Sequence, residues 1–277
     1  MSSQPAPPFT GQHLFSNVDQ QAIPTAFVTH LDKIIAMDQA LAYKGHTYDL
    51  LHIQPGQHLL DVGCGAGDDV RAMAERVGAA GSVIGLDNSA TMIHTAQERT
   101  SGVPLSVEFR LGNVMQLDFP TATFDGVRAD RVLHHITGYE QAFAEMVRIT
   151  RRHGRVVIFE PDFDGMIINA PDKAMTRQVI HTYTDRFAQG QCGRQLYQLY
   201  KAADLQEIAL YPIPFLFTEV ALAEQLIGLS TLISDMATSQ PAKAEQLARW
   251  LDGVKQAGEE GAFFFMLLGI TVVGTKT

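Results

Sequence analysis

The chain has 277 residues, of which 46% are hydrophobic and 18% are charged, and its formal net charge is −9. This length allows one large domain or two small ones with a sizeable core, and the acidic balance argues against nucleic-acid binding, which needs clustered Lys and Arg. The two cysteines exclude a disulfide framework and fit a reducing cytoplasm.

The amino-terminal part of the chain is predicted to be a flexible tail followed by helices. The tail, residues 1–18, begins with the polar run MSSQPAPPFT, which lacks an apolar leader. Residues 19–52 have a helical pattern that ends before a Gln-Pro-Gly-Gln turn at 54–57. The most apolar stretch of the chain, residues 261–274, is too short to cross a bilayer. We therefore expect a cytoplasmic protein without a membrane span.

From about residue 58 to residue 162, short apolar runs alternate with amphipathic stretches. The expected strands are 58–63, 82–87, 105–111, 124–130 and 155–160, and the expected helices are 67–77, 89–99 and 139–151. Ser89 directly follows the second strand and is a residue type that caps helices. Strands that alternate with helices predict a parallel sheet with helices on both faces.

The remainder of the chain is predicted to elaborate this core. Helices are expected over 172–189 and 194–203, a sixth strand over 205–217, a helical insertion over 218–258 and a last strand over 263–275. We expect one domain over residues 19–277. Its cofactor-binding core is placed at 54–162, and substrate-side additions are placed at 19–52, 163–203 and 218–260.

The most informative motif is LLDVGCGAGDD at residues 59–69. Its apolar run is typical of a buried parallel strand. Gly63, Gly65 and Gly67 follow at alternate positions, where glycine permits a sharp turn and a close approach to a ligand. Asp61, at the strand end beside backbone N–H groups, suits a ligand that carries both an amine and a carboxylate. Gly67 can equally serve helix packing.

Two further elements follow the second and third strands. Asp87 can accept hydrogen bonds from both hydroxyls of a ribose, each worth roughly 1.5–3 kcal/mol. Gly112-Asn113-Val114 can offer a backbone N–H group and an amide to an adenine edge. Nicotinamide-dependent dehydrogenases also use a glycine-rich turn, but their Gly-x-Gly-x-x-Gly spacing is not the spacing found here.

Together these elements resemble the class I S-adenosylmethionine (SAM)-dependent methyltransferases. The resemblance is carried by LLDVGCGAGDD (59–69), VIGLDNSATMI (83–93), LGNVMQLDFP (111–120), FDGVRADRVLHHI (124–136) and RRHGRVVIFEPD (151–162). Within that family the chain is similar to bacterial small-molecule enzymes of the ubiquinone and menaquinone biosynthesis type. The resemblance implies an α/β fold, with a Rossmann-like doubly wound sheet of seven strands whose last strand is antiparallel. It also implies a helical amino-terminal cap and a helical insertion before the last strand.

The resemblance further implies SAM as the cofactor, with S-adenosylhomocysteine as its product, and it implies no metal. The residues that would bind the cofactor are Asp61, Gly63 and Gly65 for the methionine moiety, Asp87 for the ribose hydroxyls, Asn88 and Met92 against the adenine, Asn113 and Val114 at the adenine edge, and the carbonyl of Ala129 for the amino group.

Candidates for a general base lie where the parallel strands end. His134 and His135 follow the fourth strand, and because adjacent helical residues point in different directions, at most one of them is expected to face the site. Cys64 has no neighbouring base in the sequence and is expected to be a buried filler. Further residues that could contact a ligand, or could serve only ion pairs, turns and packing, are Arg131, Glu160, Asp162, His181 and Tyr183.

The helical insertion carries an apolar surface at roughly helical spacing, formed by Leu222, Leu226, Ile227, Leu229, Leu232 and Ile233. Core packing explains such a surface. The alternative is a lid over an apolar substrate, aided by Phe27, Leu31 and Tyr43 of the amino-terminal helices.

From these features we expect methyl transfer to a small, apolar or aromatic-containing molecule, with oxygen or nitrogen as the acceptor atom before carbon. The alternatives are a non-catalytic SAM-binding regulator, a nicotinamide-dependent dehydrogenase and an RNA methyltransferase, the last disfavoured by the acidic charge. The sequence leaves the oligomeric state open.

Overall fold

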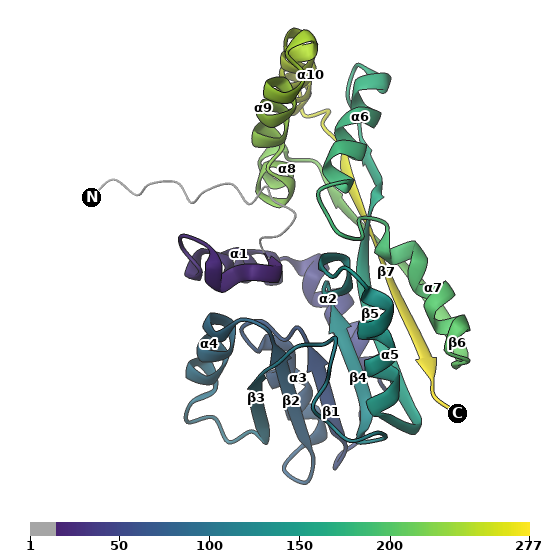
Figure 1. The fold of residues 1–277 in the computed structure, drawn as a ribbon. Coiled ribbons are helices and arrows are strands. Elements are labelled where there is room, and N and C mark those ends of the chain that lie inside the picture. Colours follow the sequence, from purple (N-terminus) through teal and green to yellow (C-terminus); the bar gives the residue numbers. More distant parts are fainter. Residues whose placement is uncertain (1–14) are drawn as a thin grey trace.

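Seven strands form one sheet in the computed structural model, which describes residues 15–277 (Figure 1). The strands are β1 (His58–Val62), β2 (Ser82–Asp87), β3 (Val107–Leu111), β4 (Phe124–Asp130), β5 (Thr150–Ile168), β6 (Gln206–Phe217) and β7 (Phe265–Thr275). Their order across the sheet is β3-β2-β1-β4-β5-β7-β6. Strands β1 to β5 pair in parallel, whereas β7 is antiparallel to both β5 and β6. The predicted seven-stranded sheet with an antiparallel last strand is confirmed.

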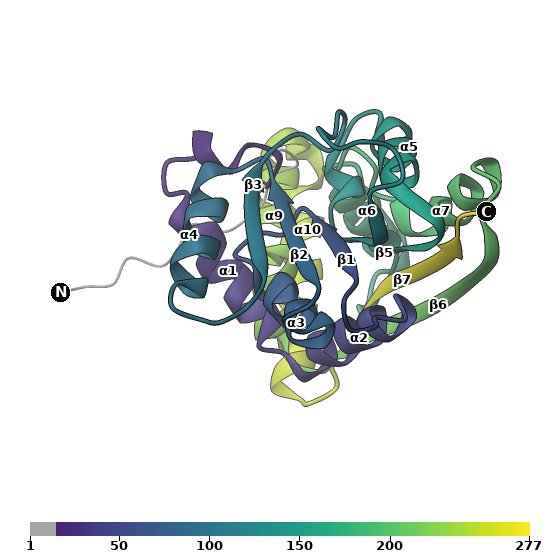
Figure 2. The same ribbon diagram turned by 90° about the horizontal axis from the view of Figure 1, so that it is seen from below.

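Helices cover both faces of this sheet, with α2 and α3 on one face and α5 and α7 on the other (Figure 2). The helices are η1 (Phe15–Gln20), α1 (Thr25–Ile35), α2 (Asp38–Leu50), α3 (Asp68–Val77), α4 (Ala90–Thr100), η2 (Leu133–His135), α5 (Tyr139–Ile149), α6 (Lys173–Thr184), α7 (Cys192–Ala202), α8 (Val220–Ile227), α9 (Leu229–Ser239), η3 (Pro241–Lys243) and α10 (Ala244–Glu259). Elements labelled η are 3₁₀ helices.

The core of the sheet is apolar on both faces because successive strand residues alternate in direction. Leu60 and Val127 belong to the cluster that includes residues of α5 and α7, while Leu59 and Val83 belong to the cluster that includes α3. Each of these four side chains is at most 1% exposed. Burying one such side chain contributes roughly 1.5–3 kcal/mol, so this double layer fixes the positions of the strand ends.

The first described element overlaps the predicted tail. The tail predicted over residues 1–18 lies outside the described residues up to residue 14, and from Phe15 the chain forms η1. Asp19 of η1 accepts hydrogen bonds from the Ser89 hydroxyl and from the backbone N–H groups of Ala90 and Thr91. Ser89 itself accepts the Met92 N–H group at 3.2 Å, which confirms it as the cap of α4.

Strand β5 is much longer than the predicted 155–160, and helix α5 ends at Ile149 instead of 151. The run Glu160-Pro161-Asp162 resembles a strand end. In the fold, however, Glu160 accepts backbone N–H groups from the turn after β4, and Asp162 accepts two hydrogen bonds from Arg194. Because both carboxylates are satisfied, the strand continues beside β7, with a register irregularity between Asp162 and Ile167.

The carboxyl-terminal half of β5 carries a second, helical layer. Helices α8, α9 and α10 stand together beyond the end of the parallel strands, close to α6 (Figure 1). Leu229, Leu232 and Ile233 are buried there with Trp250, so core packing accounts for these three residues of the predicted apolar surface.

Among the described helices, none taken alone has both the length and the apolar character to cross a membrane. Only α8 and α9, counted together as one pair bent by 63°, have that length and composition.

Candidate functional site

A cavity of about 560 Å³ lies at the carboxyl ends of β1, β2 and β4, where open α/β sheets bind ligands. One part of it is lined by the glycine loop, Asp87 and residues 112–115. Residues of η1, α1 and α2 line it from the amino-terminal side. The other part is lined by aromatic residues of β5, α6 and β6. The cavity therefore joins the predicted cofactor-binding region to the substrate-side additions.

The glycine loop has a backbone that other residues would strain. Gly63, Gly65 and Gly67 have φ of 68°, 52° and 81°, in the left-handed region that glycine adopts without cost. A Cβ atom on Gly63 would lie 2.3 Å from Cγ2 of Val132, and one on Gly67 would lie 2.8 Å from the Phe109 ring. Gly63 and Gly65 line the cavity, whereas Gly67 does not. Gly67 therefore serves packing, one of the two roles left open above.

Three backbone donors of this loop are used within the protein, although the sequence suggested that such groups would face a ligand. The N–H groups of Gly63 and Cys64 donate to the Leu86 carbonyl at 2.7 and 3.0 Å. The Gly65 N–H group donates to Oδ2 of Asp87 at 2.9 Å. At these three positions the loop offers close approach instead of free donors. Burial raises the pKa of the Cys64 thiol well above its usual value, in keeping with a filler.

Asp87 lines the cavity and is held from two sides. Its carboxylate accepts N–H groups from Gly65 and Ser89, each at 2.9 Å. Burial raises its pKa more than these hydrogen bonds lower it. The Asn88 backbone N–H group also hydrogen-bonds this carboxylate, so Asp87 is held at the cavity with part of its acceptor capacity left for a ribose hydroxyl.

The four residues predicted around the adenine also line the cavity: Asn88, Met92, Asn113 and Val114. Met92 and Val114 are buried and give this part of the wall an apolar surface. The side-chain oxygen of Asn113 accepts the Met115 N–H group at 2.9 Å, so it stabilises the turn after β3.

Asp61 and Ala129 lie outside the lining of the cavity, in contrast to the expectation. Both are 1% exposed within adjacent strands, and Asp61 stands opposite Arg128 in the register of β1 and β4. Nη1 of Arg128 donates to Oδ1 of Asp61 at 2.9 Å. Because this carboxylate is paired with Arg128 and lies outside the lining of the cavity, the structure does not place Asp61 beside a ligand's amine, and its role stays a prediction.

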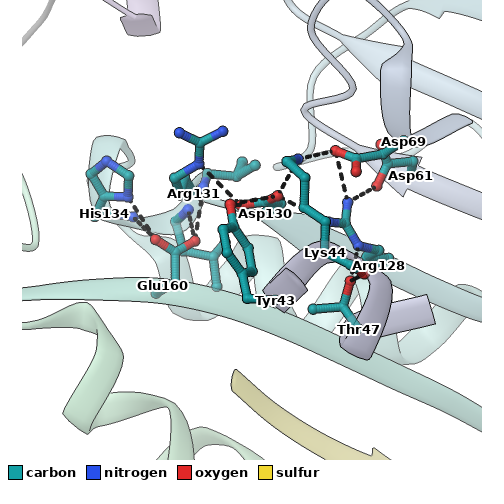
Figure 3. Close-up of polar contacts among 12 residues, drawn as sticks. Tyr43, Lys44, Thr47, Asp61, Asp69, Arg128, Asp130, Arg131, His134 and Glu160 are labelled. Carbon is teal, nitrogen blue, oxygen red and sulfur yellow. Dashed lines mark hydrogen bonds and ion pairs between the residues drawn. The ribbon is translucent and has the colours of Figure 1, made fainter. Parts of the chain in front are cut away.

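Arg128 is the centre of a buried ionic network (Figure 3). Besides Asp61, it donates to Thr47 and to Asp130, each at 2.9 Å, and it lies 3.3 Å from Asp69. Lys44, from α2, bonds Asp69 at 2.5 Å and Asp130 at 2.6 Å. Further members are Tyr43 and Arg131, which donate to Asp130, and Tyr48, which donates to Asp69. The network links the amino-terminal helix α2 to the sheet.

The charges of this network balance, with three cationic and three acidic side chains. Burial raises the pKa of Asp69 and Asp130, but the neighbouring cations outweigh burial and lower both values. Burial raises the pKa of Asp61 to about 7 despite Arg128. Lys44, Asp69, Asp130 and Arg131 also line the cavity, so the network presents two cations and two carboxylates to a ligand.

His134 and His135 both line the cavity, although at most one was expected to do so. They belong to the three-residue 3₁₀ turn η2, and their ring centres are 3.8 Å apart. Nδ1 of His134 lies 2.6 Å from Oε2 of Glu160. Nδ1 of His135 has no hydrogen-bond partner in the part of the chain that is described. Their catalytic role remains a prediction.

Three other candidates lie outside the lining. Glu160 is buried beneath η2, and Asp162 is held by Arg194 at 2.5 and 2.7 Å. The exposed His181 lies 3.5 Å from Asp164. Within residues 15–277, no group of three His, Cys, Asp or Glu side chains could hold a metal ion.

The apolar part of the cavity is here called the aromatic chamber. It is lined by Phe159, Phe163, Tyr183, Phe187, Phe215, Phe217, Leu226, Ile227, Leu267 and Leu268. The Phe163 and Phe187 rings are stacked at 4.0 Å, and Tyr183 meets both rings edge-on. Leu31 and Tyr43 also line the cavity, whereas Phe27 and Leu222 do not.

Reasoning from the sequence missed the ionic network. A signal was present, because Arg128 lies in a strand that is buried along its whole length, and a buried cation requires a partner. Asp130 is close to it in the sequence, but its other partners come from α2, β1 and α3, and no local pattern connects these segments.

Comparison with known proteins places the sheet region in a described family. Residues 60–158 match a family described as a methyltransferase domain. The chain is 36% identical over 267 residues to an uncharacterized 37.1 kDa protein in transposon Tn4556 of Streptomyces fradiae, covering 95% of this chain and 75% of that protein.

Two further comparisons concern an enzyme and a fold. Over 138 residues the chain is 33% identical to a demethylmenaquinone methyltransferase of Bacillus cereus, a match that covers 50% of this chain and 58% of that enzyme. The solved structure of the YcgJ protein from Bacillus subtilis has a similar fold, with a TM-score of 0.58, 19% identity, and coverage of 85% of this chain and 98% of that one.

Proposed function

Because the chain belongs to the class I SAM-dependent methyltransferases, we propose that it transfers a methyl group to a small apolar or aromatic molecule. The observation that carries this proposal is the continuous cavity, which runs from the glycine loop and Asp87 to the aromatic chamber. SAM, when bound, supplies a methyl group activated by its sulfonium, for an in-line displacement that leaves S-adenosylhomocysteine. The protein has to bind and orient the two molecules and to exclude water. Orientation of this kind can supply up to roughly 7–11 kcal/mol of the barrier.

The nucleoside part of the cofactor fits the polar end of the cavity. Asp87 would accept the ribose hydroxyls, and Asn88, Met92, Asn113 and Val114 would enclose the adenine. Gly63 and Gly65, which have no side chains, would let the ligand approach the backbone.

The methionine moiety fits the ionic network better than it fits Asp61. An amino acid is a zwitterion, and the network presents both signs of charge to the cavity. Lys44 and Arg131 would bind its carboxylate, and Asp69 and Asp130 would bind its ammonium group. The role implied for Asp61 by the resemblance is thus proposed for two other acids.

The acceptor molecule fits the aromatic chamber. Its walls are apolar and its rings are held in stacked and edge-on contacts, so a flat apolar molecule would gain the most by entering it. Oxygen or nitrogen is the preferred acceptor atom, and carbon is the second choice.

Titration calorimetry with S-adenosylhomocysteine and with NAD tests the cofactor. We expect binding of the first and none of the second. The reverse result would identify a dehydrogenase and would contradict the proposal. Transfer of a labelled methyl group to a panel of small aromatic metabolites would then test catalysis against a role restricted to cofactor binding.

Filling the aromatic chamber should weaken acceptor binding and leave cofactor binding unchanged. We expect Leu226→Trp to raise the Kd of N-phenyl-1-naphthylamine, an apolar fluorescent probe, at least about tenfold, because the indole would occupy the chamber; one or two lost ring contacts account for such a change. The matched control is Leu222→Trp, one helical turn earlier on α8 and outside the lining. Equal losses in the two variants would show that the probe binds elsewhere.

A further inference from the structure

We propose that the Tyr183 hydroxyl donates a hydrogen bond to an uncharged oxygen of the methyl acceptor, the carbonyl of an aromatic ketone or ester. This inference rests on the proposed methyl transfer. It adds the chemical class of the molecule that would enter the aromatic chamber, and it names the residue that would select it.

The Tyr183 hydroxyl is the one polar side-chain group among the residues of the aromatic chamber. Tyr183 is only 7% exposed, yet its hydroxyl forms no hydrogen bond within residues 15–277. Burial raises the pKa of Tyr183 above its usual value, so the hydroxyl keeps its proton and can donate it to a hydrogen bond. Because proteins pair nearly all buried polar groups, a lone donor that lines a cavity indicates a ligand atom as its partner.

Two stacked rings connect Tyr183 to the cofactor end of the cavity. Val132, in the turn after β4, lies against the glycine loop. In the same turn, the His134 ring meets Phe163 and Phe187 edge-on, with both pairs of ring centres 5.4 Å apart. Tyr183 meets the same two rings edge-on at 5.4 and 5.3 Å. A bicyclic aromatic molecule in the chamber is therefore long enough to extend from this turn to Tyr183.

The charge beside the hydroxyl favours an uncharged oxygen as its partner. Arg186, three residues after Tyr183, also lines the cavity, and its positive charge acts on the phenol oxygen. This charge favours an electron-rich ligand atom and disfavours an ammonium group. Nη2 of Arg186 donates to Oδ2 of Asp235 at 2.7 Å, so the guanidinium charge is already balanced. A carboxylate in the chamber would be buried without a cation of its own, whereas a carbonyl oxygen carries no such penalty.

Thermal unfolding of Tyr183→Phe separates ligand recognition from a structural role. We expect an unchanged Tm, because no group within residues 15–277 loses a hydrogen-bond partner. The matched control is Tyr200→Phe. The buried Tyr200 hydroxyl donates to the Val272 carbonyl at 3.0 Å, so its removal should lower the Tm by about 2–4 °C. A loss in Tyr183→Phe as large as in Tyr200→Phe would show a structural role and overturn the proposal.

Displacement of N-phenyl-1-naphthylamine measures the recognition itself. The ligands are 2-acetylnaphthalene, which carries a ketone, 2-ethylnaphthalene, which has the same shape without the oxygen, and 2-naphthoate. We expect Tyr183→Phe to raise the Kd of 2-acetylnaphthalene about tenfold, because its oxygen is then buried without a donor, and to leave the Kd of 2-ethylnaphthalene unchanged. The native protein should bind 2-naphthoate more weakly than 2-acetylnaphthalene.

Equal changes in the Kd of 2-acetylnaphthalene and 2-ethylnaphthalene, or no displacement of the probe by 2-acetylnaphthalene, would refute Tyr183 as the donor. Tighter binding of 2-naphthoate than of 2-acetylnaphthalene would show that Arg186 recognises a carboxylate, and it would overturn the carbonyl class. The series uses the protein alone. Failure of S-adenosylhomocysteine to bind in a separate titration would therefore contradict the proposed function and leave the Tyr183 result intact.

Discussion

Replacing Arg128 by methionine should lower the free energy of unfolding by about 3–5 kcal/mol, because it leaves buried carboxylates without their shared partner. Arg128 is fully buried and contacts Asp61, Asp69 and Asp130 within 3.3 Å. Methionine fills much of the same volume but supplies no charge. Urea unfolding followed by circular dichroism measures this loss.

The loss should depend on pH. In the native protein the pKa values of Asp69 and Asp130 are lowered, so their contribution to stability is complete above about pH 4 and is lost as the pH falls. Without the guanidinium, Asp61 loses the cation that it pairs with, so burial would raise its pKa further above about 7 and the stability of the variant would keep falling as the pH rises toward 8, whereas Lys44 would still bond Asp69 and Asp130. The difference between native and variant protein should therefore be larger at pH 8 than at pH 5.

Arg76→Met is the matched control. Arg76 forms an ion pair with Asp49 on the surface, with side chains 40% and 70% exposed, and its guanidinium lies 4.9 Å from the ring centre of Tyr48; such exposed contacts contribute at most about 1 kcal/mol each. The double variant Arg128→Met/Asp61→Asn should recover part of the loss, because it also removes one unpaired charge. If Arg128→Met costs no more than Arg76→Met, the network does not stabilise the fold.

The sheet could be predicted from the sequence because its signals are local. Buried strands such as β1 and β2 are short apolar runs, and the motifs at their ends have fixed spacing. The end of β5 could not be predicted, because the fate of Glu160 and Asp162 depends on the turn after β4 and on Arg194 of α7. The strand continues past Glu160 and Asp162 because residues distant in the sequence donate hydrogen bonds to both carboxylates.

In the candidate site, too, local motifs predicted some of the residues and missed what depends on pairing between strands. Gly63, Gly65, Asp87 and the residues around the predicted adenine position line the cavity, and their cofactor roles stay predictions. Asp61 does not, because the pairing of β1 with β4 brings Arg128 beside it. A motif identifies the residue at a strand end, but it does not include the residue opposite on the neighbouring strand.

The two histidines show a related limit. A helical turn would have separated the directions of His134 and His135, whereas the 3₁₀ turn η2 holds both at the cavity with their rings close together. The hydrogen bonds that Glu160 accepts from this turn decide its shape, and that carboxylate lies one strand further along the sheet.

Asp87→Asn should weaken S-adenosylhomocysteine binding about 10- to 100-fold, because the amide keeps one acceptor for the loop and loses a charge-assisted bond to the ribose. Such a bond is worth roughly 1.5–3 kcal/mol, and about 1.4 kcal/mol corresponds to a factor of ten. Titration calorimetry measures the change, and Asp118→Asn, an exposed aspartate outside the cavity, is the control.

The 2′-deoxy analogue of S-adenosylhomocysteine sharpens the test. It should bind the native protein more weakly, and Asp87→Asn should cost it less than it costs the parent ligand, since the hydroxyl that met the carboxylate is already gone. Equal losses for both ligands would mean that Asp87 acts only through the loop that it holds, by way of Gly65 and Ser89, and that the ribose is recognised elsewhere.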